Sequence, residues 1–249
     1  MSLQTTSTPA DFEALAQTDL SGTTCVVLDI LRATSSMITA LANGAEQILP
    51  VASIDEALAA KAKYPDALLC GERDGLRITA AQTGGTEFDL GNSPREYTAE
   101  MVAGKTLIST TTNGTRALRA CANAERVLVA SFLNLAATAE HLRAMAPENL
   151  VLVCSGTYEE AALEDTLAAG ALADLLQEQF NECDDATQTA RLLFNSAPVE
   201  ETILQAKNAQ RLLSLPDLAD DVSFCLRRDA HSLLAAMDEQ GWVQRLAGS

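Results

Sequence analysis

Several short apolar runs of this chain end in clusters of acids, arginines and hydroxyls. The first cluster follows Val26–Leu28 and contains Asp29, Arg32 and Ser35. Carboxylate oxygens are the hard ligands that Mg²⁺ prefers, and a guanidinium can bind a phosphate or sulfonate through two parallel hydrogen bonds. The cluster therefore indicates a site for a divalent cation and an oxygen-rich anion. Taken alone, it is equally compatible with an ordinary strand-end acid and a surface arginine.

Three further clusters repeat this pattern later in the chain. They are residues 71–74, 110–115 and 155–165. Glu72, Glu164 and Asp165 contribute carboxylates that suit Mg²⁺ and are poorly suited to a soft metal. Together with Asp29 they form the predicted metal-ligand set.

Alternating strands and helices must position these clusters. Val26–Leu28 is too short for a helix and reads as a strand buried on both faces, and Ala33–Ala42 has apolar residues at helical spacing. The same alternation continues to about residue 179 and predicts an α/β fold with a mostly parallel or mixed sheet between helical layers. Parallel strands would bring the four clusters to one edge of the sheet, where such folds bind ligands.

The domain organisation expected from the sequence is simple. Residues 1–10 are polar and predict a disordered lead, and residues 11–249 predict one α/β domain with a mainly helical part from about residue 186. Within that part, Asp221–Leu226 is expected to be a strand or extended segment, and Ala230–Gln240 a closing helix.

Composition excludes several classes of partner. The 249 residues carry a net charge of −17, which argues against nucleic acid and anionic membranes as main partners. Six cysteines are scattered without a CxxC pair, as in reduced cytoplasmic proteins, and no run is long enough to span a bilayer. We expect a cytoplasmic protein that acts on a small, anionic, oxygen-rich substrate, which the family resemblance described below implies to be an organophosphate. The sequence leaves the oligomeric state open, with a homodimer as one option.

Other catalytic classes fit less well. The chain has no GxxxxGK[ST] phosphate loop, no GxGxxG after a strand and no GxSxG, and both His141 and His231 lie in helical segments. An apolar strand that ends in Asp29 also resembles the nucleophile motif of haloacid-dehalogenase phosphatases. Position 31 is Leu, however, where that mechanism needs a second aspartate.

Six motifs in order resemble the 2-phosphosulfolactate phosphatase family over residues 24–230. They are VVLDILRATSSMITALANGA, GER at 71–73, FDLGNSPREY, GKTLISTTTNGTRAL, LEDTLAAGA and DVSFCLRRD. The resemblance implies a Mg²⁺-dependent phosphatase of α/β/α layered fold. It also implies hydrolysis of (2R)-2-phospho-3-sulfolactate to 3-sulfolactate and phosphate, a step of coenzyme M biosynthesis.

Roles for individual residues follow from the clusters and the resemblance together. Asp29, with Glu72 and Asp165 or Glu164, would bind Mg²⁺. Catalysis is assigned to Asp29, Arg32 and Arg73, the two arginines holding phosphate and sulfonate. The substrate-binding set comprises Arg32, Ser35, Arg73, Asn92, Ser93, Thr110, Thr112, Asn113, Gly114 and Arg116. The alternative from another class is a non-catalytic protein that binds an anionic metabolite and needs no metal.

Overall fold

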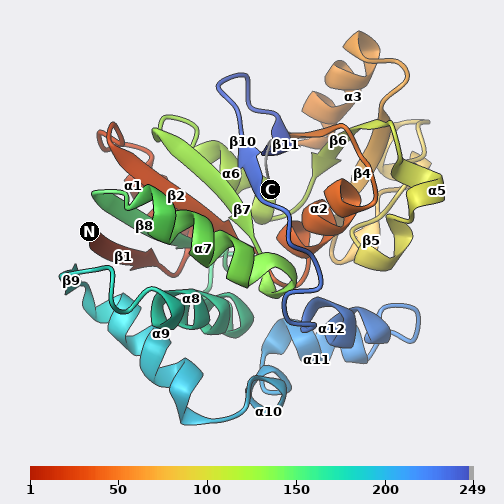
Figure 1. Cartoon of the computed structure of the whole chain (residues 1–249). Helices are drawn as coiled ribbons and strands as arrows, with labels where there is room; N and C mark the ends of the chain where they lie inside the picture. The colour runs from red at the N-terminus through yellow and green to blue at the C-terminus, as the bar shows by residue number, and fades with distance from the viewer. Residues whose placement is uncertain (247–249) are drawn as a thin grey trace.

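The computed structural model describes residues 1–246. Within this range, eleven strands form a sheet in the order β5-β4-β6-β3-β11-β10-β7-β2-β8-β1-β9 (Figure 1). The strands are β1 (Ser2–Thr6), β2 (Thr23–Leu28), β3 (Gln47–Pro50), β4 (Leu68–Arg73), β5 (Leu76–Arg77), β6 (Thr106–Thr110), β7 (Arg126–Ala130), β8 (Asn149–Cys154), β9 (Glu182–Cys183), β10 (Ala235–Met237) and β11 (Val243–Arg245). The α-helices are α1 (Pro9–Leu15), α2 (Ala33–Ala42), α3 (Ile54–Lys63), α4 (Ala80–Thr83), α5 (Ala99–Val102), α6 (Gly114–Ala120), α7 (Leu135–Met145), α8 (Leu163–Leu175), α9 (Asp185–Ser196), α10 (Val199–Ile203), α11 (Lys207–Leu213) and α12 (Ala219–Cys225).

Helices cover both faces of the sheet, which gives three layers (Figure 1). Along β2, Val26 and Leu28 pack into an apolar cluster with α7 and α8. Cys25 and Val27 point to the other face and pack with α2 and α6. Because successive side chains of a strand point to opposite faces, a strand covered on both sides is apolar throughout. The predicted α/β sandwich and the two-sided burial of this strand are confirmed.

The sheet consists of two parallel sets joined by an antiparallel hairpin. One set is β4-β6-β3 and the other is β7-β2-β8-β1-β9. Hairpin β10-β11 lies between them and pairs antiparallel with β7 and with β3. Three successive antiparallel pairings mean that the two sets do not share one direction. The carboxyl ends of all the parallel strands therefore do not lie along a single edge of the sheet, contrary to the prediction.

The joining hairpin replaces the closing helix predicted for Ala230–Gln240. Ala235 and Val243 are buried on the sheet, and Ala235–Met237 pair with Val127–Val129. The alanines and methionine of this segment favour a helix locally. The open edges of two parallel sets offer backbone partners that an isolated segment lacks, and these tertiary contacts override the propensity.

The N-terminal segment is also ordered, contrary to the disordered lead predicted for residues 1–10. Ser2–Thr6 pair in parallel with residues 149–153 of β8 along five positions. Leu3 is only 1% exposed, and Thr8 caps α1 through a reciprocal bond with Asp11. A polar strand is stable here because β8 already provides a paired template.

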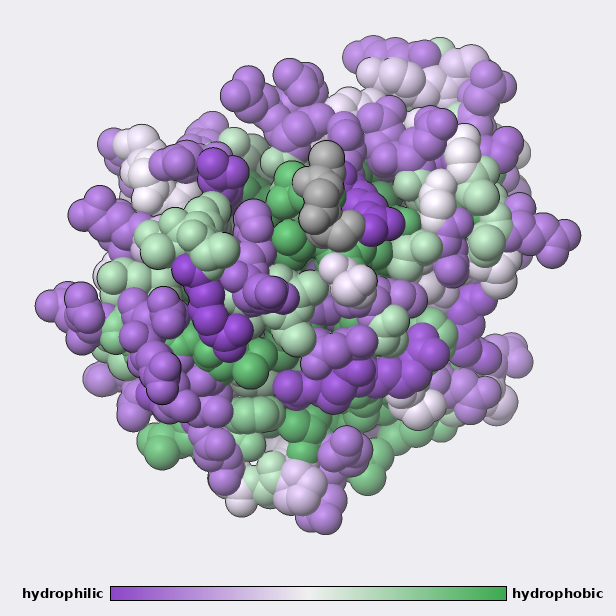
Figure 2. Space-filling view, in the orientation of Figure 1, coloured by the Kyte–Doolittle hydropathy of each residue, from purple (hydrophilic) through white to green (hydrophobic). Residues whose placement is uncertain are grey.

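Helices dominate the segment from α9 to α12, as predicted, but one detail differs. The strand or extended segment expected at Asp221–Leu226 is helix α12. Val222 and Cys225 are buried three residues apart, which is helical spacing. Figure 2 shows a largely hydrophilic face, with apolar atoms gathered low in the view over these helices. Among residues 1–246, no helix is long and apolar enough to cross a membrane.

Candidate active site

Residues from separate segments converge on one cavity of about 60 Å³. Of the predicted site residues, it is lined by Asp29, Arg32, Glu72, Asn92, Thr112 and Asn113. They come from the end of β4, from the loops after β2 and β6 and from the segment before Pro94. The strand ends of both parallel sets thus contribute to the same cavity, although they do not form the single edge that was predicted.

Asp29 is held at the end of β2 by the first turn of α2. Its Oδ1 accepts a hydrogen bond from the backbone N–H of Ala33 (3.0 Å), and Thr34 Oγ1 bonds the Asp29 backbone. Burial raises the pKa of Asp29 to about 6; the N–H of Ala33 and the hydroxyl of Ser155 oppose the rise, and the charge of Glu72 adds to it. Two buried acids near one another favour a proton or a cation between them.

Gly114 lies against Asp29 for a steric reason. A Cβ at this position would lie 2.5 Å from Asp29 Oδ2 and 2.6 Å from the Cβ of Ala33. Only glycine therefore lets the loop after β6 approach the end of β2, and Gly114 acts through close packing of the two loops.

The carboxylate of Glu72 accepts hydrogen bonds from both loops that follow β4 and β6. Its Oε1 accepts bonds from the backbone N–H (2.8 Å) and the hydroxyl (2.9 Å) of Thr112, and its Oε2 accepts one from the N–H of Gly75 (2.7 Å). Three donors fix the position of this carboxylate at the cavity. The side chain is 7% exposed and lines the cavity.

Arg32 is oriented by a buried acid that the sequence did not single out. Its Nη1 donates to Asp221 Oδ2 (2.7 Å) and its Nη2 to the carbonyl of Gly75 (2.6 Å). Asp221, fully buried on α12, also accepts bonds from Ser93 and Arg95. The sequence analysis missed Asp221 because residues 221–226 were expected to be extended, whereas helix α12 turns Asp221 toward Arg32.

Glu164 and Asp165 lie near the cavity without lining it. Asp165 accepts bonds from the N–H groups of Ile30 and Gly156 and from the hydroxyl of Ser155, so both of its oxygens orient loops. Burial, then the charges of Asp29 and Glu164, raises the pKa of Asp165 well above its usual range. Glu164 lines a neighbouring cavity of about 580 Å³, and burial raises its pKa to about 7.

The predicted set of four carboxylates is therefore divided between two cavities and a loop anchor. Within residues 1–246, no group of three or more His, Cys, Asp or Glu side chains is placed to hold a metal ion. Protein sites for Mg²⁺ commonly use one or two carboxylates, with water and substrate oxygens completing the shell. Asp29 and Glu72, which both line the smaller cavity, meet that lower requirement.

Asn113 supplies a further oxygen that suits a cation. Its Nδ2 donates to the carbonyls of Ser155 and Tyr158 (2.8 Å each), which fixes the orientation of the amide. Its Oδ1 is buried and has no hydrogen-bond partner. An unpaired buried acceptor is costly unless a ligand, ion or water satisfies it. A cavity with two acids and an unpartnered amide oxygen fits Mg²⁺.

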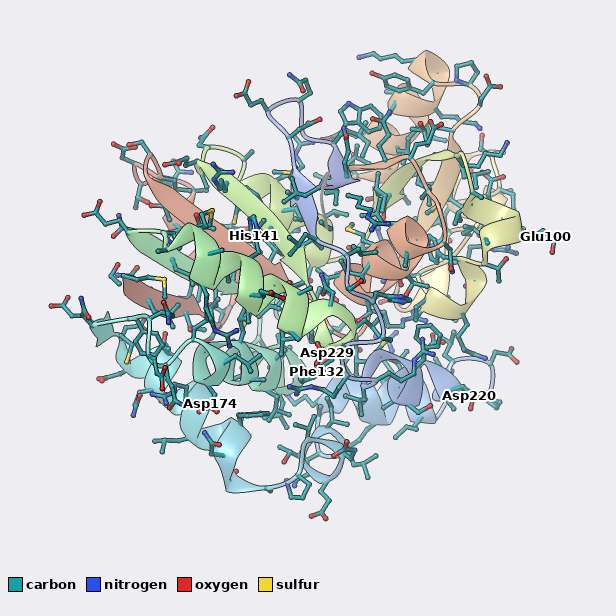
Figure 3. All side chains as sticks on the ribbon, in the orientation of Figure 1. Glu100, Phe132, His141, Asp174, Asp220 and Asp229 are labelled. Atoms are coloured by element: carbon teal, nitrogen blue, oxygen red, sulfur yellow. The ribbon has the colours of Figure 1, made fainter. Side chains whose placement is uncertain are left out.

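The remaining predicted residues stand outside the cavity lining. Ser35 donates to the carbonyl of Ile30, and Arg73 donates to Thr110 and to the carbonyl of Glu72 on its own strand. Arg116 lies at the surface and pairs with Glu13 and Glu159. Neither histidine lines the cavity, and His141 lies on α7 (Figure 3).

Several lining residues were missed by the sequence analysis. They are Asp74, Gly75, Thr157, Tyr158, Asn208 and Arg211. Asp74 and Tyr158 belong to clusters already noted at the strand ends, and both have positive φ (55° and 53°), which is uncommon for non-glycine residues. Asn208 and Arg211 lie on α11, a surface helix in the sequence pattern, and no local signal connects them to the strand ends.

Comparison with known proteins agrees with the motifs. The model of the family described as 2-phosphosulpholactate phosphatase matches residues 11–240. A protein of Thermotoga petrophila named as a probable 2-phosphosulfolactate phosphatase is 43% identical over 83% of this chain and 85% of its own. A relative with the same name in Thermotoga maritima is 41% identical over 86% of this chain and 88% of its own. Another, in Caldanaerobacter subterraneus subsp. tengcongensis, is 37% identical over 94% of each chain. The chain belongs to the 2-phosphosulpholactate phosphatase family, whose members are phosphoric-monoester hydrolases, as its motifs predicted.

Proposed function

We propose that this chain is a Mg²⁺-dependent phosphatase that hydrolyses (2R)-2-phospho-3-sulfolactate to 3-sulfolactate and phosphate. The observation that carries the proposal is the cavity lined by Asp29, Arg32, Glu72 and Asn113, together with the unpartnered Oδ1 of Asn113. The family and the names of the relatives support the substrate class. The proposal includes the place in coenzyme M biosynthesis that the motif resemblance implies.

Asp29, Glu72 and Asn113 would hold the metal ion. When bound, Mg²⁺ neutralises charge on the phosphoryl oxygens and favours ionisation of a bound water. The chain's own part is to keep these ligands rigid. Thr112 and Gly75 donate to Glu72, and Ala33 donates to Asp29, so neither carboxylate needs to reorganise when substrate arrives.

Arg32 would bind the phosphoryl group. A guanidinium has five N–H donors, and the bonds to Asp221 and Gly75 use two of them. The others remain for phosphoryl oxygens at the cavity that Arg32 lines. Fixing the guanidinium in advance lowers the entropic cost of binding and stabilises charge that develops in the transition state.

Phosphate release from 2-phosphosulfolactate, with Mg²⁺ and then with excess EDTA, tests the proposal. We expect metal-dependent release that is lost in an Asp29→Asn variant, with Asp66→Asn, an exposed acid outside the cavity, as the matched control. Release that persists undiminished in EDTA would contradict the metal assignment. Binding of the ester without any release would favour the non-catalytic binding protein.

A further inference from the structure

Arg211 joins three segments at the wall of the cavity. From α11, its Nη1 donates to the phenol oxygen of Tyr158 (2.6 Å) and its Nη2 to the backbone carbonyl of Asp74. Tyr158 in turn donates to Asp74 Oδ1 (3.0 Å). The loops after β4 and β8 are thus connected through one half-buried guanidinium.

The charge of Arg211 is less compensated than the charges of Arg32, Arg116 and Lys207. Arg32 faces Asp221, Arg116 faces Glu13 and Glu159, and Lys207 faces Glu160. These ion pairs have N···O distances of 2.7 Å for Arg32, 2.5 and 3.2 Å for Arg116, and 2.6 Å for Lys207. Among residues 1–246, no carboxylate lies within ion-pairing distance of Arg211. In a chain of net charge −17, such a cation is a natural counter-ion for an anionic ligand.

The size of the cavity indicates where the rest of a substrate would lie. About 60 Å³ accommodates on the order of four to six waters, enough for a phosphoryl group and too little for a three-carbon acid with two more anionic groups. The neighbouring cavity is about 580 Å³. The two share Thr157, Tyr158, Asn208 and Arg211 as a common wall. A substrate whose phosphoryl group lies beside Asp29 would therefore extend toward this wall.

We propose that Arg211 is a specificity-determining residue that binds an anionic group of the substrate other than the phosphoryl group. The incoming sulfonate or carboxylate takes the place of the Tyr158 phenol and the Asp74 carbonyl as acceptor for the guanidinium. Both acceptors are neutral, so the exchange replaces neutral partners with a charged one, which makes stronger hydrogen bonds. This inference rests on the proposed phosphatase function and extends it to substrate choice.

Kinetics with three phosphate esters test the proposal. The esters are 2-phosphosulfolactate, 2-phospholactate, which lacks the sulfonate, and glycerol 2-phosphate, which lacks both additional anions. In Arg211→Gln, we expect kcat/KM for 2-phosphosulfolactate to fall about 10- to 100-fold, mainly through KM, while that for glycerol 2-phosphate changes less than about 3-fold. Arg211→Lys keeps the charge without the planar fork and should recover part of the loss. Arg119→Gln, which removes a surface arginine paired with Glu56, is the control of equal charge change.

2-Phospholactate distinguishes the two anions, because it keeps the carboxylate and lacks the sulfonate. A loss confined to 2-phosphosulfolactate assigns Arg211 to the sulfonate, and a loss shared with 2-phospholactate assigns it to the carboxylate. An equal loss for all three esters overturns the proposal, because Arg211 would then act on the phosphoryl group or on the fold.

Calorimetric binding of 3-sulfolactate separates this inference from the proposed function. This product carries no phosphoryl group, so its affinity reports the remaining contacts without turnover. We expect the Kd to rise at least about 10-fold in Arg211→Gln and to stay unchanged in Arg119→Gln. An unchanged Kd in both variants overturns the role of Arg211 even if the chain is a phosphatase. Absence of hydrolysis with the expected change in Kd overturns the function and leaves the binding role supported.

Discussion

Replacing Asp221 with asparagine tests how the fold holds Arg32 at the cavity. Asp221 is fully buried and accepts bonds of 2.7 Å from Arg32 Nη1, Arg95 Nε and Ser93 Oγ. Asparagine has the same shape but turns one oxygen into a donor that faces existing donors, and it leaves the charge of Arg32 uncompensated. Breaking a buried ion pair from one side costs about 3–5 kcal/mol. We therefore expect Asp221→Asn to lower the free energy of unfolding by about 3 kcal/mol or more.

Urea denaturation followed by circular dichroism measures this change, and the neighbouring Asp220 provides the control. The Asp220 side chain is 79% exposed and lies 3.5 Å from Arg95, so Asp220→Asn should change stability by no more than about 0.5 kcal/mol. Phosphate release should fall in the Asp221 variant, because Arg32 loses the partner that orients it. Equal stability of the two variants would refute the reasoning. A double-mutant cycle with Arg32→Gln should show coupling of at least about 1 kcal/mol.

Three further predictions follow from the same geometry. Burial raises the pKa of Asp29 from 3.8 to about 6, so the folded chain holds this proton more tightly than the unfolded chain, and the free energy of unfolding falls as the pH rises from about 4 to 6. In EDTA at pH 7, Asp29→Asn should therefore raise the free energy of unfolding by up to about 3 kcal/mol and abolish turnover. A variant less stable than the wild type would contradict the shift. Gly114→Ala should destabilise by about 1–3 kcal/mol and abolish phosphate release, since its Cβ would lie 2.5 Å from Asp29 Oδ2; wild-type kinetics would show that the two loops can separate. Leu3→Ala should cost about 2–4 kcal/mol in urea denaturation, whereas a disordered N-terminus would make it neutral.

Local sequence patterns were sufficient to predict the central strand and the helix that follows it. The run Val26–Leu28 predicted β2 because only a strand covered on both faces is apolar without alternation. The helix Ala33–Ala42 coincides with α2. In both places the residues that specify the element are the residues that form it, and neighbours in space add to a preference already present.

Segments whose structure depends on a distant partner were not predictable in this way. Ser2–Thr6 is a strand because β8 pairs with it, and Ala235–Met237 is a strand because β7 and β11 lie on either side. Their own composition favours a disordered lead and a helix, respectively. Backbone pairing across more than a hundred residues is a tertiary interaction, and it leaves little trace in the side chains of a short strand.

The candidate site likewise contains residues that the sequence predicted and residues that only the tertiary packing brings to the cavity. The sequence by itself indicated which strand ends contribute to the candidate site. Asp29 directly follows an apolar run, Glu72 and Asn113 follow apolar runs after one glycine and a few hydroxyl residues, and all three line one cavity. The tertiary structure decided which charged groups face that cavity. Arg116 has the right residue type at a strand–helix junction but points to surface acids, whereas Arg211 is brought to the cavity wall by the packing of α11. Charge and residue type are local properties, and the direction of a long side chain is set by the packing of elements far apart in the chain.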